Sequence, residues 1–278
     1  MNSQPASRVR TATVPAAPAH GPSRRTIILS SSVIAATAAM LQVQMHEYAH
    51  GITAAVQGAP ATISSLMAEH QSVPGVDATL ATLAGPLFSI VLAVVLYAAS
   101  RPLPAGYLRA FLTWMSFAAA QGTFGYLIVG MFMPVGDTAV LFEAWGFSSF
   151  GYIMAGVIGL AGMLFLSYLL SREILRTLSD RGDIIAASVL TWLVATAVMA
   201  VVYVSAALIS GYSAEYLVPT LMGATTTLVF APMATFWWQR VPHLHRPWDH
   251  GSPVVQGVML VLAIAVVLWH ALAPVTIG

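Results

Sequence analysis

The chain has 278 residues, of which 58% are hydrophobic and 8% are charged, and it contains no cysteine. A mean hydropathy of +0.80 excludes an ordinary soluble domain and predicts an all-α protein that crosses a membrane several times. The lack of cysteine excludes disulfides and thiolate ligands, so any metal must be held by His, Asp or Glu. The formal net charge of +1 gives no sign of a nucleic-acid partner, and we expect none.

Residues 1–25 are rich in Ser, Pro and Ala and hold too little apolar surface to fold, so we predict a disordered cytoplasmic tail. The stretch from Ser23 through Arg24 and Arg25 is similar to a twin-arginine export signal, and Ala36-Thr37-Ala38 would suit a cleavage site. Cleavage there would remove most of the membrane span that follows. We therefore predict that the segment is retained.

Seven apolar segments are each long enough, at about 20 residues, to cross a bilayer as a helix. They run from Ile27 to about Val56, Ala78 to Ala99, Ala110 to Met133, Gly151 to Leu170, Ile184 to Ile209, Leu217 to Trp237 and Val254 to Leu272. All basic residues are arginines, found in the tail and in alternate connections, while the other connections carry acidic residues and no Arg. This bias predicts a cytoplasmic N-terminus and an outside C-terminus.

The first span ends in the motif His46-Glu47-Tyr48-Ala49-His50. On a helix, His46 and His50 project from one face and can hold one zinc ion, with Glu47 beside them as a general base for a bound water. A charged group at mid-bilayer costs about 2.5–3.5 kcal/mol, which favours a functional role over a buried polar contact without metal. Because the span is longer than a bilayer needs, we expect it to be tilted, broken near Gly51, or to hold the histidines slightly inside the hydrocarbon edge.

The second span opens on the same side of the membrane with Gly85, Pro86 and Ser89. Gly85 allows another backbone to come close, and Pro86 removes a backbone donor. This pattern predicts either a break that exposes polar groups beside the metal or a simple kink.

The third span runs outward, as the first does, and ends at Asp137 after Pro134 and Gly136. Asp137 therefore lies at a depth that matches the two histidines, and the Pro and Gly would let its carboxylate turn back towards them. We predict Asp137 as the third ligand. The alternatives are Glu143, Glu69 and His70, which lie on the same side.

The later spans give weaker signals. Ala118 with Gly122, and Ala155 with Gly159, are small residues four apart that predict close helix packing. Pro219 and Pro232 predict kinks in the sixth span. The stretch from His243 to His250 could form a second metal site, although its irregular spacing favours a solvated loop.

Together these motifs resemble the site-2 protease family of intramembrane zinc metalloproteases. That family places H-E-x-x-H on one core helix, a Gly-Pro segment on the next and an Asp ligand on a third, and residues 27 to 145 hold His46 to His50, Gly85-Pro86 and Asp137 in that order. The resemblance implies a three-span protease core, 26–145, followed by a four-span accessory region, 146–278. It also implies that Gly85, Pro86 and Ser89 bind substrate.

The chain departs from the family pattern at three points. Ser89 stands where the family has Asn, and Thr138 follows the Asp where the family usually has Gly. The family places its site towards the cytosol, whereas the Arg distribution here places it outward.

The expected function is a zinc metalloendopeptidase with one zinc ion, embedded in a bacterial plasma membrane and acting on membrane proteins or peptides. In this interpretation Glu47 activates water and then protonates the leaving amine. The main alternative is a non-proteolytic membrane protein that binds or transports zinc with the same ligands. A membrane oxidase with His-bound iron would need more histidines on one face than His46, His50 and His70 provide. The sequence does not indicate an oligomeric state.

Overall fold

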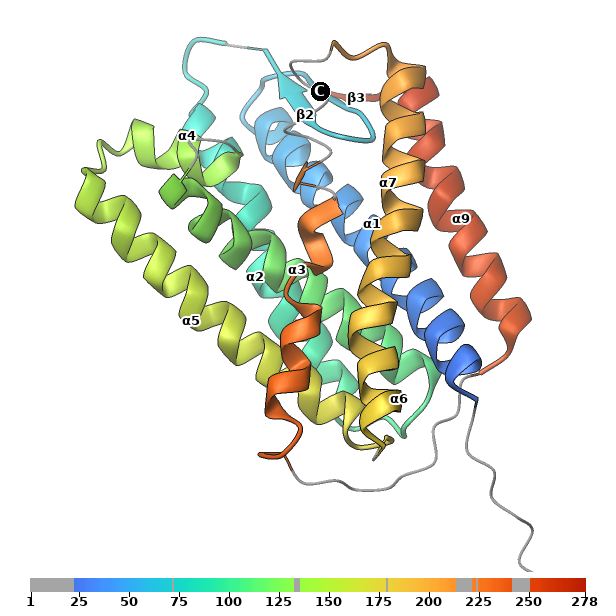
Figure 1. Ribbon diagram of the computed structural model, residues 1–278. Coiled ribbons are helices and arrows are strands. Elements are labelled where there is room, and N and C mark those ends of the chain that lie inside the picture. Colours follow the sequence, from blue (N-terminus) through green and yellow to red (C-terminus); the bar gives the residue numbers. More distant parts are fainter. Residues whose placement is uncertain are drawn as a thin grey trace, which may run out of the picture.

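The computed structural model describes residues 23–71, 73–132, 136–178, 180–213, 222–223, 225–241 and 251–278. Long helices form an all-α bundle, and a small sheet covers one end of it (Figure 1). The predicted tail falls mostly outside the described residues, and the first helix already begins at Arg24, where the Ser23 side chain accepts a hydrogen bond from the Thr26 N–H.

Six segments within these ranges are long and apolar enough to cross a membrane, which indicates an integral membrane protein. They are α1 (Arg24–Val56), α2 (Ala78–Ser100), α3 (Tyr107–Phe132), α5 (Ser149–Ile174), the continuous run of α6 (Arg181–Ile185), the π-helix η1 (Ala186–Leu190) and α7 (Thr191–Ser210), and α9 (Pro253–Leu272). They coincide with six of the seven predicted spans. The short helix α4 (Asp137–Ala144) follows α3.

The remaining predicted span, Leu217 to Trp237, lies partly outside the described residues, Pro219 included. Its described part is α-helical at residues 222–223 and 225 and then continues as two 3-10 helices, η2 (Thr226–Leu228) and η3 (Ala231–Trp237). The Gln121 amide explains the irregularity, because it donates to the Thr226 carbonyl and accepts from the Phe230 N–H. These are the two groups that an α-helical turn would join to each other.

Helix α1 runs through the centre of the bundle, with α2 and α3 packed on one side and α7 and α9 on the other (Figure 1). Its buried face is rich in small residues, including Ala35, Ala36, Ala38 and Ala39, which let the neighbouring backbones approach. The helix continues through Gly51, so of the three alternatives for this long span the break is wrong, and tilt and depth stay predictions. A similar close approach joins α5 to α3, since a Cβ at Gly159 would lie 2.6 Å from the Phe124 carbonyl oxygen.

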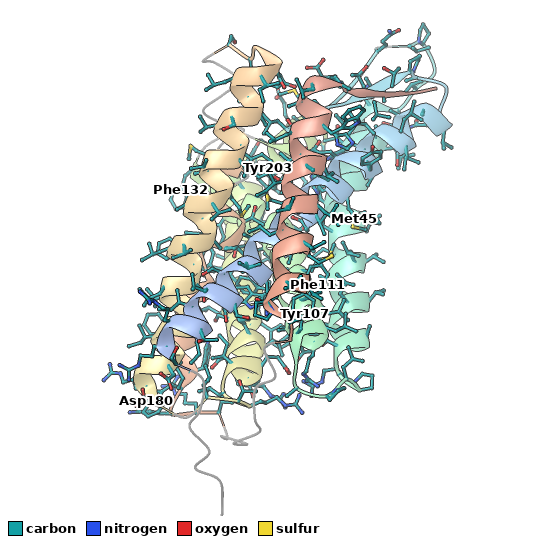
Figure 2. All side chains as sticks on the ribbon, turned by 90° about the vertical axis from the view of Figure 1, so that its right-hand side faces the viewer. Met45, Tyr107, Phe111, Phe132, Asp180 and Tyr203 are labelled. Atoms are coloured by element: carbon teal, nitrogen blue, oxygen red, sulfur yellow. The ribbon has the colours of Figure 1, made fainter. Side chains whose placement is uncertain are left out.

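The two ends of the bundle differ in charge. At one end, strands β1 (Ala61–Ile63), β2 (Ala68–His70) and β3 (Val275–Ile277) form an antiparallel sheet in the order β2-β1-β3. The arginines within the described ranges cluster at the opposite end, towards which Figure 2 shows Asp180 and Tyr107. Membrane orientation and the division at residue 145 stay predictions.

Candidate metal centre

The metal-binding candidates begin with two histidines one helical turn apart on α1. The rings of His46 and His50 meet edge to face with their centroids 4.7 Å apart, and the two Nε2 atoms are 3.1 Å apart. Both side chains are buried. The i, i+4 spacing in the sequence predicted this arrangement, because such residues share one face of a helix.

Asp137 joins the histidines from the first residue of α4. Its Oδ2 atom lies 2.9 Å from His46 Nε2 and 3.3 Å from His50 Nε2. Gly136, with φ of +76°, allows the turn that aims the carboxylate inward, while Pro134 lies outside the described residues. A Cβ at Gly136 would also lie 2.7 Å from the Tyr126 ring.

The three side chains form a buried group whose ligand atoms all lie within 4.8 Å of one another, and this group could bind a metal ion. Within the described residues, Glu143 and Glu69 are exposed and His70 lines the adjoining cavity, but none of the three belongs to the group. Burial alone would raise the pKa of Asp137, yet hydrogen bonds from His46 and His50 outweigh it and hold that pKa below its usual range. An ionised carboxylate is the form that binds a metal.

Hydrogen bonds behind each imidazole fix its orientation. His50 Nδ1 donates to the Ala81 carbonyl oxygen at 2.9 Å, so Nε2 faces the group and carries a lone pair in the neutral form of the ring that binds a metal. His46 Nδ1 lies 2.9 Å from Ser89 Oγ, and this hydroxyl also accepts from Gln42 Nε2 at 3.2 Å. In the tautomer that donates from Nδ1, His46 likewise presents Nε2 to the group. Metal-bound histidines in proteins typically have such partners.

Helix α2 comes unusually close to this histidine pair. A Cβ added at Gly85 would overlap the His50 ring and lie 2.8 Å from His46 Nε2, so only glycine fits. Pro86 stands inside a helix that continues past it, and its carbonyl accepts a hydrogen bond from Thr123 on α3 at 3.0 Å. Gly85 and Ser89 thus contact the histidines directly, and Ser89 is fully buried behind His46.

Glu47 is partly buried and lines the same cavity as the three candidate ligands. Its Oε2 atom accepts a hydrogen bond from the Ala68 N–H of β2 at 2.8 Å. This contact orients the carboxylate and leaves Oε1 for another partner. The sequence predicted the position of Glu47 on the helix but not its link to the sheet.

The cavity has a volume of about 420 Å³, within the range of small-ligand and peptide sites. Its walls come from α1, the start of α2, the second half of α3, the β2 hairpin and the segment around η2. Its lining includes Tyr126 of α3 and Phe230, which follows η2. The cavity therefore brings together the candidate metal ligands, a carboxylate and apolar walls.

The group fits a tetrahedral metal with an open position. Ligand atoms about 2.0–2.1 Å from a shared tetrahedral ion lie roughly 3.3 Å from each other. In this group Asp137 Oδ2 lies 2.9 Å from His46 Nε2 and 3.3 Å from His50 Nε2, and the two Nε2 atoms are 3.1 Å apart. Two imidazole nitrogens and one carboxylate oxygen are ligands that zinc accepts, and three protein ligands leave a fourth position free.

The His-rich stretch from His243 to His250 lies outside the described residues. No family model matches the sequence, and no curated protein and no solved structure matches it either.

Proposed function

We propose that this chain is a membrane-embedded zinc metalloprotease that hydrolyses peptide bonds of membrane-associated substrates. The observation that carries the proposal is the meeting of His46 and His50 with Asp137, which is 91 residues away from His46 in the chain. Convergence over such a separation requires a fold that brings two helices together at this point. A chance H-E-x-x-H match would not need it.

The ligand chemistry favours zinc over other metals. Magnesium and calcium prefer sites made of oxygens alone, whereas two imidazoles with one carboxylate suit zinc. Structural zinc sites have four protein ligands, and catalytic sites have three with one open position. The group of three opening into a cavity corresponds to the second kind.

In this proposal each residue has a defined task. A bound zinc ion would lower the pKa of a water molecule and polarise the peptide carbonyl. Glu47, with Oε2 held by the Ala68 N–H, would take the water proton on its free carboxylate oxygen and return it to the leaving amine. Ser89 and the Ala81 carbonyl would keep the imidazoles in the ligand tautomer.

The order of motifs along the chain supports a relation to site-2 proteases, and Gly85 strengthens the comparison because it is the point where α2 meets the histidines. We therefore propose that the substrate enters the 420 Å³ cavity, which is lined by the two histidines that Gly85 contacts. The Arg distribution favours a site at the outer side of the membrane, and we propose a bacterial plasma membrane as its location.

Glu47→Gln tests the proposal because it keeps the side-chain shape and removes the base. The full chain and the variant would be produced in cells, purified for metal analysis, and compared by mass spectrometry of newly formed peptide termini in the membrane fraction. We expect about one zinc per chain in both and new termini with the wild type alone. Equal termini from both proteins would refute the protease assignment, and zinc in both without new termini would support a non-proteolytic zinc protein.

A further inference from the structure

The end of the bundle opposite the metal centre holds a dense basic cluster. Arg109 donates to both oxygens of Glu173 at 2.7 and 2.9 Å, and Arg101 and Arg176 donate to the same carboxylate at 3.0 and 3.3 Å. Arg109 also donates to two loop carbonyls, which fixes it in place. Three arginines against one glutamate leave two positive charges that Glu173 does not balance.

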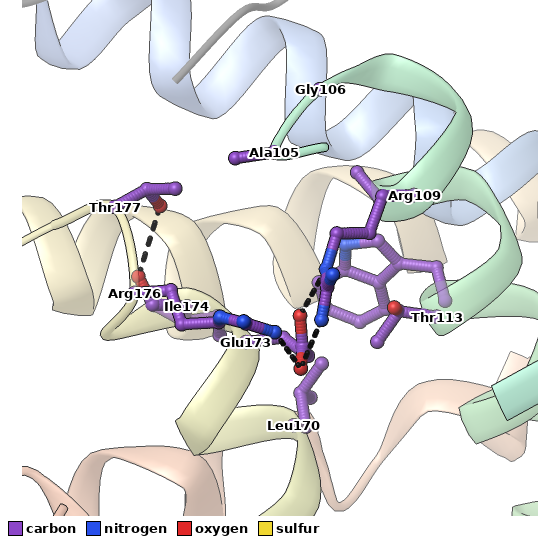
Figure 3. A pocket seen from close by; sticks show the side chains of 11 residues that line it. Ala105, Gly106, Arg109, Thr113, Leu170, Glu173, Ile174, Arg176 and Thr177 are labelled. Carbon is purple, nitrogen blue, oxygen red and sulfur yellow. Dashed lines mark hydrogen bonds and ion pairs between the residues drawn. The ribbon is translucent and has the colours of Figure 1, made fainter. Parts of the chain in front are cut away.

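A small cavity of about 50 Å³ adjoins this cluster, between the start of α3 and the end of α5 (Figure 3). Because 10–15 Å³ of such volume is enough for one water, the cavity can hold a group of several atoms. Figure 3 shows Arg109 and Arg176 on either side of the Glu173 carboxylate, to which both are joined by hydrogen bonds. Leu170 contributes an apolar wall.

Thr113 supplies a second and independent sign of a ligand. Its side chain is 5% exposed and lines the cavity, and its hydroxyl has no hydrogen-bond partner among the described residues. Leaving a buried hydroxyl unpaired costs about 1–3 kcal/mol, so a ligand acceptor at this point would be stabilising.

Two tyrosines lie against arginines at the same end of the bundle as the cavity. The guanidinium of Arg101 lies 5.4 Å from the centre of the Tyr97 ring, and that of Arg172 lies 5.9 Å from the Tyr168 ring. Tyr and Trp gather at the membrane–water boundary in membrane proteins, next to the lipid head groups. In a bilayer-spanning orientation, such a boundary would bring the phosphates of one lipid leaflet to the level of the cavity.

We propose that this cavity binds the phosphodiester group of an anionic phospholipid. Arg176 donates one of its five N–H groups to Glu173, so the others can bind phosphate oxygens together with the Thr113 hydroxyl. The two unbalanced charges select an anionic head group over phosphatidylcholine, whose choline would add a positive charge beside Arg101. Basic pockets between transmembrane helices bind acidic lipids in this way.

The test uses the purified full chain in detergent, with phosphatidylglycerol, phosphatidylcholine or inorganic phosphate as probes, and native mass spectrometry to count retained lipid. We expect the wild type to retain one phosphatidylglycerol and to unfold at a higher temperature in its presence. Arg176→Gln and Thr113→Val should each weaken retention about tenfold, since each removes a hydrogen bond to a charged group. Thr113→Val keeps the side-chain shape, and circular dichroism would check folding.

Arg172→Gln is the matched control, because it removes one positive charge from the same end of α5 while its guanidinium lies over Tyr168. We expect it to change lipid retention much less than Arg176→Gln does, because Arg172 does not line the cavity. An equal loss with Arg172→Gln would mean general attraction to a charged surface and would overturn the proposal. Equal retention of phosphatidylcholine, or equal stabilisation by inorganic phosphate alone, would also overturn it.

Discussion

In the proposed metal centre Ser89 would act through His46, which it contacts at 2.9 Å from a fully buried position. Replacing it by Ala removes the partner of Nδ1 and frees the imidazole to rotate or change tautomer. We expect Ser89→Ala to fold normally and to bind zinc about 10–100-fold more weakly, as is typical when such a partner is lost. Competition with a chelating dye would measure the zinc affinity of the variant and of the wild type.

The control for that variant is Ser100→Ala. Ser100 is also fully buried on α2, but its hydroxyl donates to the Tyr97 carbonyl in its own helix, at the basic end of the bundle. Its removal should leave zinc affinity unchanged. Equal zinc affinity of wild type and Ser89→Ala would show that Ser89 does not position His46.

Gly85 sets how closely α2 approaches the histidines. Gly85→Ala would place a methyl group inside the His50 ring, so the ring must move or the helices must separate. We expect loss of most bound zinc, measured by metal analysis of the purified variant. Gly257→Ala on α9 is the control, since a Cβ there meets nothing within 4 Å and Ala favours the helix by about 1 kcal/mol. Full zinc content in Gly85→Ala would contradict the observed packing.

Residues on one helix were easier to predict than contacts between helices. The spacing of His46 and His50 determines their shared face, and the outward course of the first and third spans pointed to Asp137. The partners Ser89, Gln42 and Ala81 depend on the register between α1 and α2, which no local pattern encodes. The role of Ser89 behind His46 was therefore not predicted.

At the scale of whole elements, a hydrogen bond joins α1, the helix that carries His46 and His50, to α9. Tyr48 donates to His270 Nε2 at 2.7 Å, and His270 Nδ1 donates to the Val266 carbonyl at 2.7 Å. We expect Tyr48→Phe to lower stability by about 1–3 kcal/mol, because it leaves a buried nitrogen unpaired, and to leave zinc content intact. Unfolding in a denaturing detergent would measure the loss.

A double-mutant cycle separates this contact from general packing. If the hydrogen bond joins α1 to α9, Tyr48→Phe should cost much less in a chain that already carries His270→Leu. Additive losses in the two single variants would show that the two side chains act independently.

The observed bounds of the long helices agree closely with the spans predicted from hydropathy. Six apolar runs became long helices because a chain in lipid must satisfy its backbone polar groups internally. The segment around η2 differs because Gln121, a residue of another helix, binds its carbonyl and N–H groups. Such an insertion depends on tertiary structure, and the local sequence around Thr226 contains no sign of it.

At the scale of the whole molecule, the metal would join α1 to α4 and tie the third span to the first. Removal of zinc by a chelator should therefore lower the unfolding temperature, and re-addition should restore it. A thousandfold excess of zinc over its Kd corresponds to about 4 kcal/mol of added stability. Differential scanning fluorimetry would follow the shift.

Asp137→Asn is the control for chelation, because it keeps the side-chain size and removes the anionic ligand. Its unfolding temperature should depend much less on zinc than that of the wild type. If neither the chelator nor added zinc changes the unfolding temperature of the wild type, the result would argue against an ion at this position.

The antiparallel pairing of β1 with β3 has a consequence for biosynthesis. Thr62 of β1 comes shortly after α1, while its partner in β3, Thr276, is 214 residues further along the chain. The ribosome therefore releases β1 and β2 long before β3 exists, and α1 enters the bilayer next to a hairpin in which one edge of β1 has no partner. Strand pairing between such distant segments is slow to form. A nascent chain halted before residue 275 would keep that strand edge open to other proteins, so quality-control factors could distinguish chains that lack β3 from chains that carry it.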